Sequence, residues 1–265
     1  MTSRHGKAGR IDSDETADAL FQGKLKLYQS RSGYRFSLDA VLLARFATVK
    51  PGEQAADLGT GNGVIPLILV YLNPSLSVTG VETQQSMAER ARKNVQLNGF
   101  EKQITILYGD VRAIDSIAAR QSHEVVVCNP PYRKPTSGRV SPNAEKQIAR
   151  HEIKGSLDDF LRAGDYLLPV KGRMAVIYQA AHCLDLLEAM RKVGIEPKRL
   201  RMVHSYADAE ASLVLAEGMK GGKSALKVLS PLVIYERDQK YTFEVQSMLA
   251  GSTESYSSLG SRVTG

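Results

Sequence analysis

Short apolar strands alternate regularly with helices between residues 53 and 192, and this pattern limits the fold more than any other feature of the chain. Strands are predicted at residues 54–58, 76–81, 104–108, 124–128 and 173–178, and helices at 64–71, 84–97, 114–119, 157–168 and 183–192. Strands separated by helices at this spacing predict a mostly parallel sheet with helices on both faces, which is a Rossmann-like α/β fold. The 265 residues suffice for one such domain but not for two separate enzymes.

The two ends of the chain follow other patterns. Residues 24–28 alternate like an edge strand, and Ser32-Gly33 marks a turn before Tyr34-Arg-Phe36, so we expect a short hairpin there. Ser37 then reads as the N-cap of a helix that runs to Phe46.

Three extended runs at residues 199–204, 212–218 and 226–235 have no helix between them, so we expect antiparallel strands at the C-terminal edge of the sheet. Residues 1–20 and 250–265 are too polar to pack, and we expect two flexible tails around a domain that spans residues 24–240.

The charge and cysteine content narrow the possible partners. Lysine and arginine total 35 against 28 acids, a net charge of +7, which favours a polyanionic partner such as nucleic acid without requiring one. The two cysteines and five histidines show no ligand spacing, so we expect no metal. Residues 1–18 lack the apolar core of a secretory signal, and no apolar run is long enough to span a bilayer, so we expect a cytoplasmic protein without a membrane partner.

The segment Val125-Val-Val-Cys-Asn-Pro-Pro-Tyr132 reads as a buried strand that stops at a stiff turn. The turn presents the amide of Asn129, the carbonyl of Pro130 and the ring of Tyr132 on one rim of a possible pocket. The side-chain oxygen of Asn129 and the Pro130 carbonyl can each accept one N–H of an exocyclic amine, while Tyr132 stacks on the ring that carries it. These three residues are the predicted catalytic group.

The segment Asp57-Leu-Gly-Thr-Gly-Asn-Gly63 lies where the first core strand turns into its helix. Its glycines, Gly59, Gly61 and Gly63, permit positive φ and close approach of a ligand. The Lys-Ser/Thr ending of a P-loop is absent, and the spacing differs from a dinucleotide fingerprint. Asp57 is a poor neighbour for pyrophosphate and a good one for a cationic amino group.

Two further acids end successive strands of the predicted sheet. Glu82 can accept the hydroxyls of a ribose, and Asp110 can accept the amine of an adenine. Each acid taken alone is more simply a strand-end cap or a solvated loop residue. Together with the glycine loop, and in this order at the carboxyl ends of parallel strands, they describe a site for S-adenosylmethionine, to which Asn129 also contributes.

These motifs resemble those of the class I S-adenosylmethionine-dependent methyltransferases that methylate amino groups. Three further segments, Tyr34-Arg-Phe-Ser-Leu-Asp39, Ala149-Arg-His-Glu152 and Pro197-Lys-Arg-Leu200, most resemble the bacterial tRNA adenine N6-methyltransferases, which modify the adenine beside the anticodon of a valine tRNA. The resemblance covers about residues 25–236. It implies a tRNA substrate. We expect Phe36, Ser37 and Asp39 to help close the cofactor pocket, although the start of the following helix explains Ser37 equally well.

Basic residues offer candidate contacts for RNA phosphates. Arg133, Lys134 and Arg139 follow the catalytic motif directly, while others lie in two later groups: Lys192, Lys198, Arg199 and Arg201, then Lys220, Lys223 and Lys227. The ordinary explanation of any single one is a solvated surface charge.

Other functions fit the same motifs. A protein glutamine presents the same two amide protons, and a DNA adenine or an rRNA guanine presents a comparable exocyclic amine. A domain that binds the cofactor or RNA without turnover is an alternative of another class. Intact Asn129 and Tyr132 favour an enzyme.

Overall fold

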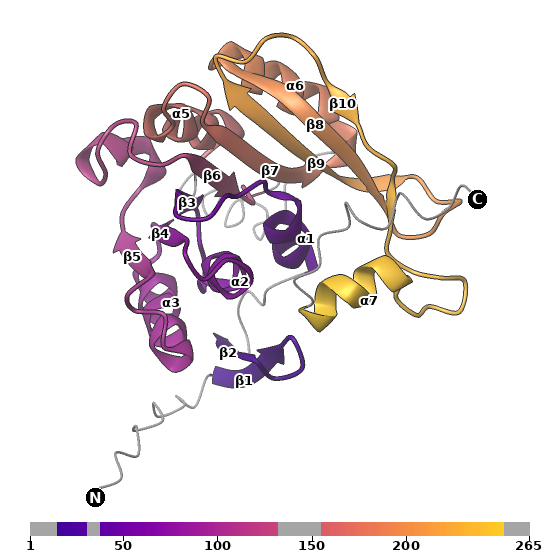
Figure 1. Cartoon of the computed structure of the whole chain (residues 1–265), viewed down its shortest axis with the longest axis horizontal. Coiled ribbons are helices and arrows are strands. Elements are labelled where there is room, and N and C mark those ends of the chain that lie inside the picture. The colour runs from indigo at the N-terminus through magenta and orange to yellow at the C-terminus, as the bar shows by residue number, and fades with distance from the viewer. Residues whose placement is uncertain (1–14, 31–37, 132–154, 252–265) are drawn as a thin grey trace, which may run out of the picture.

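The computed structural model describes residues 15–30, 38–131 and 155–251. Within these ranges the chain forms a nine-stranded mixed sheet flanked by helices, with a separate two-stranded hairpin (Figure 1). Five predicted strands form the parallel centre of this sheet: β3 (Gln54–Leu58), β4 (Ser77–Glu82), β5 (Ile104–Tyr108), β6 (Val125–Cys128) and β7 (Arg173–Gln179). The α/β fold class is confirmed.

The strands run in the order β7-β6-β3-β4-β5 across the parallel part of the sheet. The chain builds outward from β3 through β4 to β5, and then returns to the other side of β3 to form β6 and β7. A topological switch point therefore lies between β3 and β6, which is where open α/β sheets bind their ligands.

Helices cover both faces of the sheet because its central strands are apolar on both sides. In β6, Val125 and Val127 face one apolar cluster, while Val126 and Cys128 face the other. The first face is covered by α1 (Leu38–Phe46), α2 (Val64–Leu72) and α3 (Gln85–Asn98), and the second by α5 (Leu157–Leu167) and α6 (Cys183–Lys192) (Figure 1).

A predicted helix at residues 114–119 is instead the 3-10 helix η1 (Val111–Ser116). It begins earlier because the side chain of Asp110 accepts the backbone N–H of Arg112, and because Val111 and Ile114 are both buried. A second 3-10 helix, η2 (Ala180–His182), directly precedes α6.

Strands β8 (Ile195–His204) and β9 (Ala211–Lys220) form the expected antiparallel edge, and β9 pairs antiparallel with β7. The third extended run gives only β10 (Lys227–Val228) and β11 (Leu232–Val233), and both pair with β8 in parallel, so the antiparallel prediction is wrong for them. Because β9 ends beside the start of β8, the segment that follows β9 runs along the outer edge of β8 in the same direction as β8.

Helix α7 (Phe243–Ala250) was not predicted. The side chain of Thr242 caps its start, and Gly251 with φ of +73° ends it. The side chain of Val245 is buried in the core. Ala250, assigned from composition to a flexible tail, is the last residue of this helix; residues 252–265 lie outside the described residues.

The N-terminal hairpin pairs β1 (Glu15–Leu20) with β2 (Leu25–Ser30). The prediction of a flexible tail is therefore wrong for residues 15–20. The edge strand predicted at residues 24–28 pairs with the segment that precedes it in the chain. Burial explains the order of this segment. Phe21 is 1% exposed and stacks on Tyr71 of α2 with 4.9 Å between ring centroids, and the carboxylate of Glu15 accepts a bond of 2.9 Å from Arg90 of α3. The predicted turn at Ser32-Gly33 lies outside the described residues.

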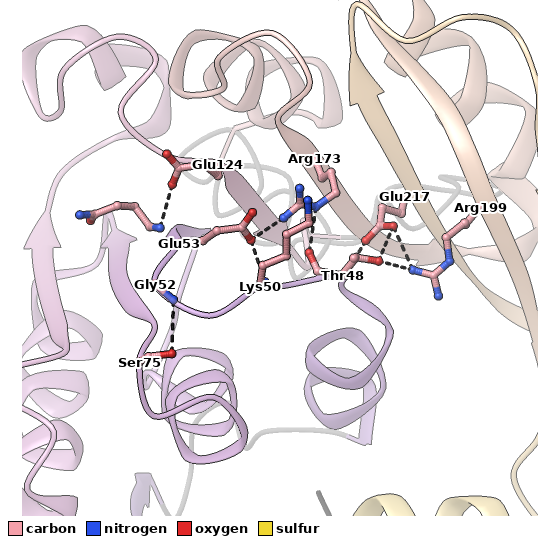
Figure 2. A network of polar contacts seen from close by, with 10 residues as sticks. Thr48, Lys50, Gly52, Glu53, Ser75, Glu124, Arg173, Arg199 and Glu217 are labelled. Carbon is pink, nitrogen blue, oxygen red and sulfur yellow. Dashed lines mark hydrogen bonds and ion pairs between the residues drawn. The ribbon is translucent and has the colours of Figure 1, made fainter. Parts of the chain in front are cut away.

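A polar network joins the α1–β3 connection to strands β7, β8 and β9 (Figure 2). The carboxylate of Glu217 accepts bonds from the Thr48 backbone N–H at 2.6 Å, the Thr48 hydroxyl at 2.8 Å and Arg199 at 2.9 Å. Arg173, the first residue of β7, pairs with Glu53 and donates to the Thr48 carbonyl at 3.0 Å. These contacts fix the end of α1 at the amino ends of the parallel strands.

Replacing Arg199 with alanine should lower the free energy of unfolding by about 2 kcal/mol, because Glu217 is buried and would lose a charged partner. The loss stays below that of a fully buried pair because the side chain of Arg199 is 32% exposed and Thr48 still donates to Glu217. Urea denaturation measures the change.

The matched control is Arg191→Ala, which removes the ion pair between Glu196 and an arginine whose side chain is 66% exposed. This control should cost less than about 1 kcal/mol. Equal losses in the two variants would show that the network contributes no more than a surface pair.

Candidate active site

A cavity of about 510 Å³ opens at the carboxyl ends of the parallel strands. Its wall is formed by the segments that follow β3, β4, β5 and β6, by the end of β7, and by residues of α1, α2, α3 and α5. The lining of this cavity includes Asp39, Gly59, Thr60, Gly61, Asn62, Glu82, Gln84, Asp110, Asn129, Pro130, Phe160 and Gln179. We call this space the carboxyl-end cavity.

The loop after β3 needs its glycines for two reasons. Gly59, Gly61 and Gly63 have φ of +75°, +59° and +82°, which L side chains rarely adopt. A Cβ on Gly59 would also lie 3.0 Å from the ring of Phe160 on α5. Gly59 and Gly61 line the cavity, whereas Gly63 packs behind it, where a Cβ would lie 3.1 Å from that of Ala91.

Glu82 braces this loop at the end of β4. One carboxylate oxygen accepts the Gly61 backbone N–H at 2.9 Å, and the other accepts the Gln84 backbone N–H at 2.8 Å. The residue is buried yet lines the cavity. The Gln84 side-chain amide also donates to Glu82 at 3.2 Å, and because a carboxylate has about four acceptor positions, capacity for a hydroxyl donor remains.

Asp110 lines the cavity at the end of β5 and also caps η1. Its carboxylate accepts the Arg112 backbone N–H at 2.9 Å and pairs with the Arg112 guanidinium. Hydrogen bonding to Arg112 holds the pKa of Asp110 below its usual value. The strand-end cap considered for this acid is therefore present, and its contact with an adenine amine stays a prediction.

Asp57 lies beneath the glycine loop and does not line the cavity. Burial raises the pKa of this carboxyl to about 7, and the charge of Glu82 adds to the increase. The nearby Thr60 hydroxyl partly offsets this increase in pKa, although the hydroxyl and the Asp57 carboxylate do not meet the geometry of a hydrogen bond.

Three side chains of the loop contain buried polar atoms without a hydrogen-bond partner among the described residues. They are both carboxylate oxygens of Asp57, the hydroxyl of Thr60 and the amide of Asn62. Buried polar groups of this kind are costly unless a partner satisfies them. Thr60 and Asn62 line the cavity, so the loop fits a ligand that carries polar and cationic groups.

The catalytic motif meets the glycine loop at the switch point. Strands β3 and β6 are adjacent and parallel, with Leu58 opposite Cys128, so Gly59 and Asn129 leave the sheet side by side at the same edge. Asn129 and Pro130 line the same cavity as the loop, as does Asp39 from α1. The predicted residues Phe36, Tyr132, Arg133, Lys134 and Arg139 lie outside the described residues.

Phe160 and Gln179 also line the cavity and were not identified from the sequence. Phe160 reads there as an ordinary apolar helix residue. Gln179 is a polar residue at the end of a buried strand, the same pattern that drew attention to Asn129, so this signal was available.

The structure separates the later basic residues into two kinds. Arg199, Arg201 and Lys220 form ion pairs with Glu217, Glu244 and Asp165, so their charges are partly compensated within the chain. Lys192, Lys223 and Lys227 are exposed, and Lys198 is half-buried. As phosphate contacts, all of them remain predictions.

Cys128 is fully buried, and burial raises the pKa of its thiol, as expected for a core residue rather than a nucleophile. No group of three or more histidine, cysteine or acidic side chains is arranged to hold a metal ion in the described part of the chain. Within the same residues, no helix combines the length and apolar character needed to cross a bilayer.

Comparison with solved structures identifies the fold. The chain aligns with a protein described as a predicted O-methyltransferase, Atu636 from Agrobacterium tumefaciens, with a TM-score of 0.65, 22% identity, and coverage of 80% of this chain and 95% of that one. A Pyrococcus horikoshii TYW2 structure, solved in complex with MeSAdo, aligns with a TM-score of 0.55 at 14% identity over 80% of this chain and 73% of that one. The fold is that of the class I methyltransferases.

The family follows from the sequence. Residues 37–182 match the family described as "Methyltransferase small domain", and the chain belongs to this family. A tRNA1(Val) (adenine(37)-N6)-methyltransferase of Porphyromonas gingivalis is 30% identical over 214 residues, 78% of each chain. One of the same name from Glaesserella parasuis is 25% identical over 78% of this chain and 85% of its own.

Several predictions are thereby confirmed. The chain is an enzyme of the methyltransferase class, it resembles the tRNA adenine N6-methyltransferases, and S-adenosylmethionine is its cofactor. The individual site residues stay predictions, although most of those within the described ranges lie around one cavity.

The buried carboxyl of Asp57 should make stability depend on pH. Because its pKa is raised to about 7 from 3.8, the folded state holds a proton that the unfolded state releases, so the free energy of unfolding should fall as pH rises from about 4 to about 7. The loss is as much as about 4 kcal/mol.

Urea denaturation at several pH values, for the wild type and for Asp57→Asn, measures this effect. The advantage of the variant over the wild type should grow with pH across that window. A difference that is constant with pH would contradict a raised pKa at Asp57.

Proposed function

We propose that this enzyme transfers a methyl group from S-adenosylmethionine to the exocyclic N6 nitrogen of adenine in tRNA, at position 37 of a valine tRNA. One observation carries the proposal: the Asn129-Pro130 rim and the glycine loop line the same cavity. The names of the curated relatives and the net charge of +7 support an RNA substrate. A tRNA-modifying role also supports the expected cytoplasmic location.

Residues at the carboxyl ends of successive strands are assigned to different parts of the cofactor. Gly59 and Gly61 allow close approach of the methionine part, and Thr60 and Asn62 supply polar groups. A cationic amino group bound there favours the ionised form of the underlying Asp57. We assign Glu82 to the ribose hydroxyls and Asp110 to the adenine amine, where Asp110 shares its carboxylate with Arg112. Asp39 and Phe36 help to close the pocket.

The lone pair of the adenine amine is delocalised into the ring, so the amine is a weak nucleophile. The side-chain oxygen of Asn129 and the carbonyl of Pro130 each accept one of its hydrogens, which favours a more tetrahedral nitrogen and stabilises the positive charge that develops there. The bound cofactor would supply an electrophilic methyl group on a sulfonium, and its sulfur would be left as a neutral thioether when the S–C bond breaks. No strong base is needed before attack, because the nitrogen becomes acidic only as it is alkylated, and its extra proton is then lost to solvent.

The target base must leave its stack to reach this rim. Unstacking costs a few kcal/mol and least in a single-stranded loop, which suits an anticodon-loop adenine. Stacking on Tyr132 contributes about 1–3 kcal/mol. Arg133, Lys134 and Arg139 follow this motif directly in the sequence and are the proposed phosphate contacts.

Incubation with labelled S-adenosylmethionine tests the substrate. Separate pools of total tRNA, rRNA, DNA and a release-factor protein are offered, followed by nucleoside mass spectrometry. We expect label in N6-methyladenosine from tRNA, and loss of that label when adenine 37 of the valine tRNA is replaced by guanine. Label in protein, rRNA or DNA alone, or in no pool, would contradict the proposal.

Asn129→Ala should lower transfer by about 3 kcal/mol of transition-state stabilisation, roughly a hundredfold, because one preorganised acceptor is lost. Asn129→Asp is the matched variant, which keeps acceptor oxygens and should retain a larger share of activity. Single-turnover kinetics measure both rates, and calorimetry should still detect cofactor binding. Transfer by Asn129→Ala at the wild-type rate would exclude this role.

A further inference from the structure

Gln179 is the last residue of β7, and it lies on the cavity wall. The alternation of β7 places it on the same face as Ala175 and Ile177, which is the face covered by α1, α2 and α3. The residue is half-buried, and its side chain does not cap η2, the helix that follows it. Its carboxamide thus has hydrogen-bonding capacity at the cavity and no role in the adjacent helix.

The order of strands places Gln179 at the substrate end of the cavity. Along the sheet edge the wall residues follow the strand order: Asp110 after β5, Glu82 on β4, Gly59 after β3, Asn129 after β6 and Gln179 on β7. The first three positions are those proposed for the cofactor. Gln179 lies one strand beyond Asn129 on the side away from the glycine loop, and neighbouring strands are about 4.8 Å apart.

We propose that Gln179 determines base specificity by donating an amide N–H to a ring nitrogen of the target adenine, N1 or N7. This inference rests on the proposed function. If Asn129 and Pro130 accept both amine hydrogens, the two ring nitrogens that flank the amine remain as acceptors, and neither can donate. Glutamine suits this position because its amide donates without adding a charge. Guanine carries a proton on N1 and a carbonyl in place of the amine, so it does not match this arrangement.

The test compares valine tRNA that carries adenosine, 1-deazaadenosine or 7-deazaadenosine at the target position, using kcat/KM for transfer. The wild type should lose about tenfold on one of the two analogues, the size expected for one hydrogen bond. In Gln179→Leu, kcat/KM on adenosine should be about tenfold below that of the wild type, and the same analogue should cause no further decrease. Cofactor affinity by calorimetry should be unchanged in this variant.

Gln179→Glu provides a second variant of nearly the same shape. Its carboxylate repels the lone pair of the ring nitrogen, so transfer should fall below that of Gln179→Leu at pH 8 and recover as the pH is lowered, when the protonated acid can donate. Gln84→Leu is the matched control, because Gln84 lines the same cavity beside Glu82 at the cofactor end. It should keep the full discrimination between adenosine and the analogue.

The outcomes separate this inference from the proposed function. Absence of adenine methylation by the wild type would overturn the function itself. Methylation with equal discrimination by the wild type and Gln179→Leu would overturn only the role of Gln179, as would a loss of cofactor affinity in that variant. Discrimination that vanishes in Gln179→Leu and persists in Gln84→Leu would support it.

Discussion

The parallel pairing of β3 with β6 brings together two segments that are about 70 residues apart in the chain. Because Leu58 lies opposite Cys128, the glycine loop and the Asn129-Pro130 rim leave the sheet at the same level. A shift of one residue in this register would reverse the face to which each side chain of β6 points. All four residues of β6 are apolar and buried, so burial alone does not select this register. The Glu124 carboxylate, just before β6, accepts the Gln54 backbone N–H at 2.8 Å and ties the two strands together at this register.

The polar groups at the two ends of the parallel strands differ in how fully they are hydrogen-bonded. At the amino ends, Arg199 pairs with Glu217 and Arg173 pairs with Glu53, and both pairs are joined through Thr48 in the α1–β3 connection, which stabilises the fold (Figure 2). At the carboxyl ends, Asp57 and Thr60 retain buried atoms without partners among the described residues. Such groups cost stability, and a site that must bind a charged cofactor has a reason to keep them.

The strand–helix pattern, the glycine loop and the Asn129-Pro130 turn could all be predicted because each rests on local sequence. The strand at residues 15–20 could not, since Glu15 looks like a tail residue until Arg90 of α3 is placed beside it. The parallel pairing of β10 and β11 depends on where β9 ends. A role for Gln179 can be inferred only once β7 is known to lie next to β6.

The central claim is that a methyl donor at the glycine loop and an amine at the Asn129-Pro130 rim meet within one cavity. A crystal structure of the enzyme with S-adenosylhomocysteine and an anticodon stem-loop RNA tests it most directly. The account predicts the ribose at Glu82 and the amine of a flipped adenine within about 3.2 Å of both the Asn129 side-chain oxygen and the Pro130 carbonyl. An adenine amine bound elsewhere, with Asn129 directed away from it, would contradict the account.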